Sequence, residues 1–167
     1  MKKFILLFII LMLTLSGCVF ELDGWIVPDD AEFLALIQEL DDPEKIGAYM
    51  LKNFTYEIHD FYTPDPYTLW QIKKGDCNDF STFGIFIAYY HGYKTYQIKI
   101  YDNTLFQHYV AVYDEYIWYS ITDCRDYYFG FDNFREIVDY VCDIRLKTWT
   151  KYIVYDYWND IVEQVTK

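Results

Sequence analysis

The segment GDCNDFSTF, residues 75–83, places a cysteine at the start of a predicted helix. Apolar residues recur at helical spacing behind it and predict a helix over residues 76–90. Gly75 allows a tight turn into this helix. The unpaired N–H groups and the dipole of a helix start favour an anion, and the thiolate is the nucleophilic form of cysteine. The segment therefore predicts a nucleophile at Cys77.

A nucleophilic cysteine needs a base, and the base needs an orienting partner. Two strands are predicted around the turn at Asp114-Glu115, with His108 opening the first and Asp123 closing the second. If Tyr113 pairs with Tyr116, Asp123 lies on the same face as His108 and diagonally across from it, with Cα atoms about 7–8 Å apart. An odd-length turn would place the two side chains on opposite faces. The pattern is consistent with a Cys–His–Asp triad.

These motifs together resemble the transglutaminase-like superfamily, whose members carry cysteine, histidine and aspartate in this order. The resemblance covers roughly residues 45–125. It implies a papain-like α+β fold in which the cysteine-bearing helix packs on an antiparallel sheet. It also implies catalytic roles for Cys77, His108 and Asp123, although Cys124-Arg125 stands where the family has Pro-Thr.

Related papain-like enzymes carry a glutamine six residues before the cysteine, where it donates to the oxyanion. The resemblance makes Gln71 the candidate for that position. An ordinary surface glutamine is the alternative reading. The backbone N–H of Cys77 is a second candidate donor for a developing oxyanion.

Other elements follow from caps, prolines and periodicity. Asp29 or Asp30 and later Asp132 are predicted helix caps, and residues 42–44 start a further helix. Residues 60–68 are predicted as a loop, and residues 148–165 fit either a strand or a helix. The predicted strands span residues 94–101, 107–113 and 116–123. The order of elements predicts one α+β domain over residues 29–167.

The N-terminus has the pattern of an export signal. Lys2 and Lys3 precede an apolar run that is too short to cross a bilayer, which takes about 20 residues. Leu15-Ser16-Gly17-Cys18 resembles the bacterial lipobox. We therefore expect a signal peptide at 1–17, lipidation of Cys18, a tether over 18–28 and a location on the outer side of a cell membrane. A signal peptide with a chance cysteine is the alternative.

The composition excludes some classes of protein. A net charge of −12 disfavours binding to nucleic acid. Cys77, His91 and His108 lack the spacing of metal ligand pairs, so no metal and no cofactor are expected. Cys124 and Cys142 could form a disulfide or remain free thiols, and the sequence leaves both possibilities open.

Three functions remain open. The first is a monomeric cysteine peptidase or amidase, or an acyltransferase, acting on envelope protein, peptide or peptidoglycan-peptide substrates. The second is an inactive transglutaminase-like module that binds peptides or glycans through its aromatic side chains, which make up 22% of the chain. The third is a cell-wall endopeptidase with a motif beginning Asp-Cys-Ser-Gly, where this chain has Asn78-Asp79 after the cysteine.

Overall fold

The computed structural model describes residues 21–22, 25–59, 62–104 and 107–167. The predicted signal peptide and Cys18 lie outside the described residues. Within the segment predicted as a tether, β1 (Glu21–Leu22) pairs antiparallel with β2 (Trp25–Ile26). None of the helices in the described ranges has both the length and the apolar character needed to cross a membrane.

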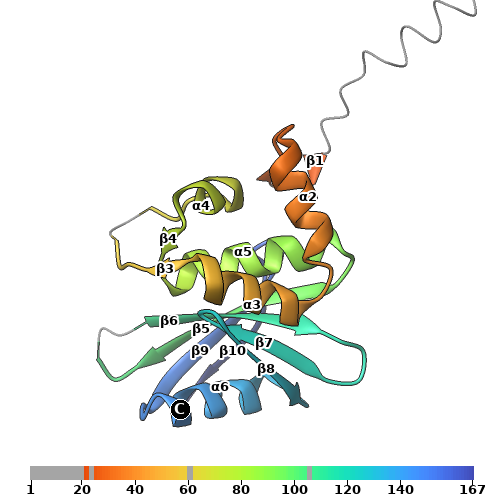
Figure 1. Cartoon of the computed structure of the whole chain (residues 1–167). Helices are drawn as coiled ribbons and strands as arrows, with labels where there is room; N and C mark the ends of the chain where they lie inside the picture. Colours follow the sequence, from red (N-terminus) through yellow and green to blue (C-terminus); the bar gives the residue numbers. More distant parts are fainter. Residues whose placement is uncertain (1–20, 23–24, 60–61, 105–106) are drawn as a thin grey trace, which may run out of the picture.

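Six strands form one antiparallel sheet in the order β10-β9-β5-β6-β7-β8 (Figure 1). Their bounds are β5 (Lys94–Asp102), β6 (Gln107–Asp114), β7 (Tyr119–Asp123), β8 (Asp126–Phe131), β9 (Trp149–Asp156) and β10 (Ile161–Thr166). A separate parallel pair, β3 (Thr55–Tyr56) with β4 (Lys74–Gly75), leads into the cysteine helix. The chain is thus an α+β domain, as predicted.

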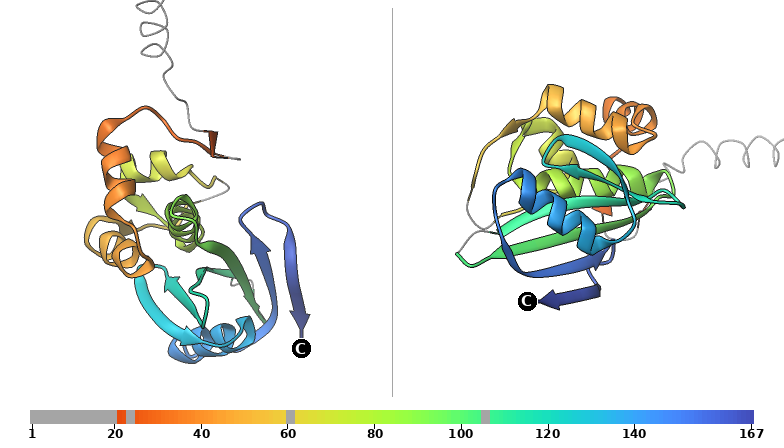
Figure 2. Two further views of the ribbon diagram at one scale, coloured as in Figure 1. Left: turned by 90° about the vertical axis from the view of Figure 1, so that its right-hand side faces the viewer. Right: turned by 90° about the horizontal axis from the view of Figure 1, so that it is seen from below.

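Helices cover both faces of the sheet. Their bounds are α2 (Ala31–Glu39), α3 (Pro43–Asn53), α4 (Pro66–Ile72), α5 (Cys77–Tyr90) and α6 (Phe134–Ile144). Figures 1 and 2 show α5 lying over one face, with α2, α3 and α4 on the same side and α6 across the opposite face. Because α5 lies between the sheet and the other three helices, it is buried on almost every side.

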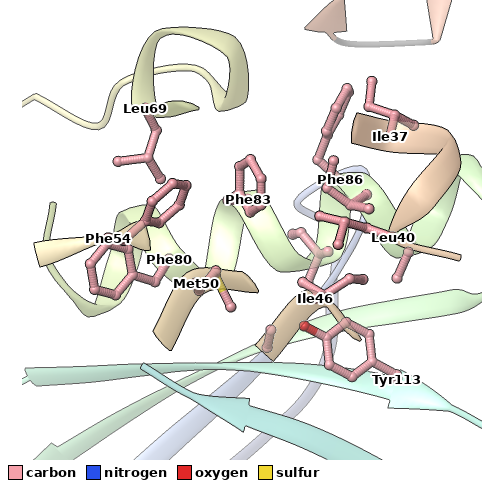
Figure 3. Packing of buried hydrophobic residues seen from close by; sticks show 14 of the residues in the cluster. Ile37, Leu40, Ile46, Met50, Phe54, Leu69, Phe80, Phe83, Phe86 and Tyr113 are labelled. Carbon is pink, nitrogen blue, oxygen red and sulfur yellow. The ribbon is translucent and has the colours of Figure 1, made fainter. Parts of the chain in front are cut away.

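Two clusters of buried side chains fill the two sides of the sheet. The first joins α2, α3, α4 and α5 to the sheet, and its largest members are aromatic (Figure 3). It includes Phe33, Phe54, Phe80, Phe83, Phe86 and Tyr113. The second lies between the sheet and α6 and includes Ile98, Val110, Val112, Ile121, Val138 and Val141. The domain therefore holds together through apolar burial on both faces of one sheet.

Several predicted elements agree with the structure and others need correction. Asp30 caps α2, as predicted. Asp76, predicted as the first residue of the cysteine helix, is instead the cap of α5. Asn133, and not Asp132, caps α6, and its side chain accepts from the backbone N–H of Glu136. The predicted loop at 60–68 is wrong at its end, because Pro66 occupies the first turn of α4 behind the cap Asp65. The ambiguous segment 148–165 forms β9 and most of β10.

The register of the β6–β7 hairpin also differs from the prediction. The loop between the strands is longer, so that Tyr113 pairs with Ser120 and Val110 pairs with Asp123. His108 is two residues from Val110, so Asp123 is still its diagonal neighbour on the same face. The shift is even, and an even shift preserves the face on which each side chain lies.

Gly84 on α5 marks the closest approach of the helix to the sheet. A Cβ at this position would collide with the hydroxyl of the fully buried Tyr113 and would lie 3.3 Å from Thr122 Oγ1. We expect Gly84→Ala to destabilise the protein by about 1–3 kcal/mol, despite the better helix propensity of alanine. Urea unfolding measures the change. In a Tyr113→Phe background, which removes the obstructing oxygen, the cost should be smaller, and a stabilising Gly84→Ala would contradict this packing.

Candidate active site

The start of α5 is fixed by a capping box on either side of Cys77. Asp76 Oδ1 accepts from the backbone N–H groups of Asn78 at 2.8 Å and Asp79 at 3.4 Å. Asp79 Oδ2 in turn accepts from the backbone N–H of Asp76 at 2.7 Å. These bonds satisfy donors of the first turn and hold Cys77 at the first helical position.

Gly75 is required for this arrangement. A Cβ at Gly75 would lie 2.6 Å from Asp79 Oδ2 and 2.9 Å from Leu69 Cδ1. Any side chain at this position would therefore push Asp79 out of the capping box. The glycine was predicted from the need for a tight turn, and the structure gives close packing as the reason.

His108 and Asp123 form a buried pair. His108 Nε2 lies 2.6 Å from Asp123 Oδ1, and each side chain is 3% exposed. An ionised carboxylate only accepts hydrogen bonds, so Nε2 carries the proton and Nδ1 is left for the thiol. Burial lowers the pKa of His108, but contacts with Asp123 and with the Cys77 side chain outweigh it and raise the pKa. The structure thus brings the three predicted residues together.

Arg145 completes the surroundings of Asp123, and no motif in the sequence pointed to it. It follows α6, and its Nη2 donates to Asp123 Oδ1 at 2.6 Å while its Nε donates to Oδ2 at 3.1 Å. Burial raises the pKa of Asp123, but hydrogen bonds and charges from His108 and Arg145 outweigh it, and the net pKa is lowered. The carboxylate is therefore held in its ionised form.

Two further side chains border the thiol. Tyr56 on β3 lies beside Cys77, and burial, together with the neighbouring Cys77, Cys124 and Asp76 side chains, raises the pKa of its phenol. Cys124 follows Asp123, and burial and the Asp123 carboxylate raise the pKa of this thiol to about 12. Cys77, Cys124 and Cys142 are all free thiols in the structure, so the disulfide left open by the sequence is not formed. Of these three described thiols, Cys77 is the one with a histidine beside it.

Gln71, the predicted oxyanion donor, lies on the exposed surface of α4. It is near Tyr67, whose hydroxyl donates to Asp30 at 2.8 Å. Its role as an oxyanion donor stays a prediction. The donors that the structure places at the thiol are the backbone N–H of Cys77 and the hydroxyl of Tyr56.

His59 supports the cysteine from the loop after β3. Its Nε2 lies 2.5 Å from Asp79 Oδ2, and the Asp79 side chain is fully buried. The hydrogen bond to Asp79 is the main cause that raises the pKa of His59. Burial raises the pKa of Asp79, although its bonds to Asp76 and His59 act in the opposite direction. Protonated His59 therefore places a positive charge beside a carboxylate that orders the start of α5.

The chain has a transglutaminase-like, papain-like fold, in which the side chains of Cys77, His108 and Asp123 are in contact. Solved structures of LapG from Legionella pneumophila share this fold. One is 15% identical with a TM-score of 0.50, covering 75% of this chain and 76% of that chain. The calcium-bound form has the same identity and TM-score and covers 77% of each chain. The EGTA-treated form is 14% identical with a TM-score of 0.51, covering 80% and 77%.

At this level of identity the likeness concerns the fold. No family model and no curated protein matches the sequence. The function of this chain must therefore be inferred from the geometry of its own side chains.

Among the residues that the structure describes, two groups of side chains have atoms close enough to share a metal ion. They are His59 with Asp76 and Asp79, and His108 with Asp123 and Cys124, each with ligand atoms within 4.8 Å of one another. Calcium takes six to eight oxygen ligands. In the first group the imidazole of His59 already occupies Asp79 Oδ2, and in the second the guanidinium of Arg145 already binds the carboxylate. Neither donor set fits calcium.

The pair of His59 and Asp79 predicts a stability that depends on pH. Because Asp79 raises the pKa of His59, the stabilisation is complete below about pH 6.5 and is lost as the pH rises through the raised folded-state value. We expect His59→Gln to lower the melting temperature more at about pH 6 than at about pH 9. In an Asp79→Asn background this difference between the two pH values should vanish. Equal losses at both pH values would show that the pair carries no charge.

Proposed function

We propose that this chain is a cysteine peptidase or amidase that forms a thioacyl intermediate on Cys77 and acts on protein or peptide substrates. The observation that carries the proposal is the buried pair of His108 and Asp123 in contact with the Cys77 side chain. A buried, oriented imidazole beside a thiol at a helix start is what nucleophilic catalysis by cysteine requires.

The reaction follows from the placement of the protons. His108 Nδ1 takes the proton of the Cys77 thiol, and the sulfur attacks the carbonyl carbon of the substrate. Charge develops on the carbonyl oxygen, where the Cys77 backbone N–H and the Tyr56 hydroxyl can donate. His108 then gives its proton to the departing amine, which leaves a thioester on Cys77. Water, activated by the same imidazole, releases the acid and restores the thiol.

The roles of Asp123 and of the acyl acceptor complete the proposal. Asp123 accepts from Nε2 and so keeps Nδ1 directed at the thiol and stabilises the imidazolium. An amine in place of water would give crosslinking. Cys77 is almost buried at 7% exposure, so a substrate must present an extended and accessible segment to it.

Selective alkylation tests the nucleophile without knowledge of the substrate. We expect iodoacetamide to modify Cys77 faster than Cys124 or Cys142, because burial raises the pKa of both other thiols. Peptide mass spectrometry measures the three rates in one sample. His108→Ala should slow the reaction at Cys77, whereas His91→Ala, at the far end of α5, should leave it unchanged.

If Cys77 reacts no faster than the other thiols, the proposal of a cysteine enzyme is wrong, and an inactive binding module is favoured. The matching activity test compares wild type with Cys77→Ala and His108→Ala on envelope protein extracts. We expect one cleavage to be lost in Cys77→Ala and to be slowed by about 10²- to 10⁴-fold in His108→Ala. Assays with added calcium and with EGTA should give the same rate.

We further propose that the protein is held on a membrane by lipid at Cys18, which the residues Leu15-Ser16-Gly17 before it support. The acidic chain gives no electrostatic attraction to anionic lipid, so lipid would be the main anchor.

Fatty-acid labelling and membrane sedimentation test the anchor. Wild type should incorporate labelled palmitate and sediment with membranes, and Cys18→Ser should lose both properties. Cys142→Ser removes a thiol inside the domain and should keep them. A Cys18→Ser protein that still sediments would exclude this anchor.

A further inference from the structure

One oxygen of the buried Asp123 carboxylate accepts hydrogen bonds from both His108 and Arg145. Asp123 Oδ1 lies 2.6 Å from His108 Nε2 and also 2.6 Å from Arg145 Nη2. Arg145 Nε donates to the other oxygen at 3.1 Å, which gives the guanidinium two points of attachment. A two-point contact fixes the plane of the carboxylate as well as its position. The direction of the bond to His108 is therefore set by Arg145.

Because His108 and Asp123 are buried, their charges must be balanced by neighbouring groups and not by water. His108 and Asp123 are each 3% exposed, whereas Arg145 is 33% exposed. With Cys77 as a thiolate, His108 as an imidazolium and Asp123 as a carboxylate, the site would carry one net negative charge, and little water is present to stabilise it. The guanidinium balances that charge and so permits a buried carboxylate.

We infer that Arg145 is a positioning residue of the Cys–His–Asp site, which orients Asp123 and limits how strongly Asp123 stabilises the His108 imidazolium. The inference builds on the proposed function, because it assigns a role within the same reaction. Arg145 acts only through Asp123, and the substrate does not need to touch it. Its two effects, orientation and charge, can be separated by substitution.

The charge effect has a defined sign. His108 faces Cys77 from α5 and Asp123 from β7, while Arg145, Cys124 and Tyr128 surround the carboxylate. The nearby guanidinium disfavours a second cation, so its removal leaves Asp123 to stabilise the imidazolium alone. The protonated form of His108 should then persist to higher pH.

A purely structural ion pair is the alternative. Arg145 also joins the end of α6 to β7, and the pair could serve only to hold the two elements together. Loss of such a pair would lower stability but would leave the titration of His108 in the folded protein unchanged. Titration therefore separates the two roles.

The decisive experiment follows the ring signals of His108 by NMR across a pH series in Cys77→Ala protein. We expect Arg145→Met to move the titration midpoint upward by about one pH unit. Arg135→Met is the matched control, because Arg135 forms an exposed pair with Asp139 at 2.9 Å on the same helix. It should leave the midpoint unchanged. A folded Arg145→Met protein with an unshifted midpoint would overturn the inference.

Arg145→Lys separates charge from orientation and also serves if the methionine variant fails to fold. Lysine keeps the charge but cannot make the two-point contact. The midpoint should stay near the wild-type value, while the rate of Cys77 alkylation in otherwise wild-type protein should fall several-fold. A wild-type alkylation rate in this variant would overturn the orienting role. The titration does not require catalytic turnover. If the midpoint shifts but the wild-type protein hydrolyses no substrate, the proposed function is wrong and the role of Arg145 in orienting Asp123 is retained.

Discussion

The buried carboxylate of Asp123 is the constraint on which the site depends. A carboxylate with 3% exposure stays ionised only where donors and cations replace water. His108 on β6 and Arg145 after α6 provide them, and these residues come from a strand and from the helix on one face of the sheet. The orientation of His108 therefore depends, through Asp123 and Arg145, on how α6 packs against the sheet. Apolar contacts of α6 with the sheet, through residues such as Val138, place the guanidinium.

The nucleophile is positioned by a second and largely local device. The capping box of Asp76 and Asp79 fixes the first turn of α5, and Gly75 leaves the space that Asp79 needs. His59 adds a positive charge to the same carboxylate. The two devices meet only because α5 docks closely on the sheet, where Gly84 allows the approach (Figure 3 shows the surrounding core). Helix docking thus brings a locally ordered thiol to an imidazole that the sheet holds.

Much of this arrangement could be predicted, and the shared face of His108 and Asp123 was predicted correctly from a strand pairing that is itself wrong. The predicted pairing of Tyr113 with Tyr116 is incorrect, yet His108 and Asp123 share a face as predicted. Side chains alternate with a period of two, so an even change in loop length moves the pairing without changing the face. The prediction of a loop over residues 60–68 is wrong from Pro66 onward, because proline is common both in loops and in the first turn of a helix, and the sequence alone does not distinguish the two.

The sequence by itself determined the features that depend on neighbours along the chain. These are the cysteine at a helix start, the alternation that aligns His108 with Asp123, and the cap of α2 at Asp30. The tertiary structure decided which distant groups complete the site. Arg145 lies 22 residues from Asp123 in the chain. This contact depends on how α6 packs on the sheet, and packing arises from apolar burial summed over the whole domain, which no local pattern encodes.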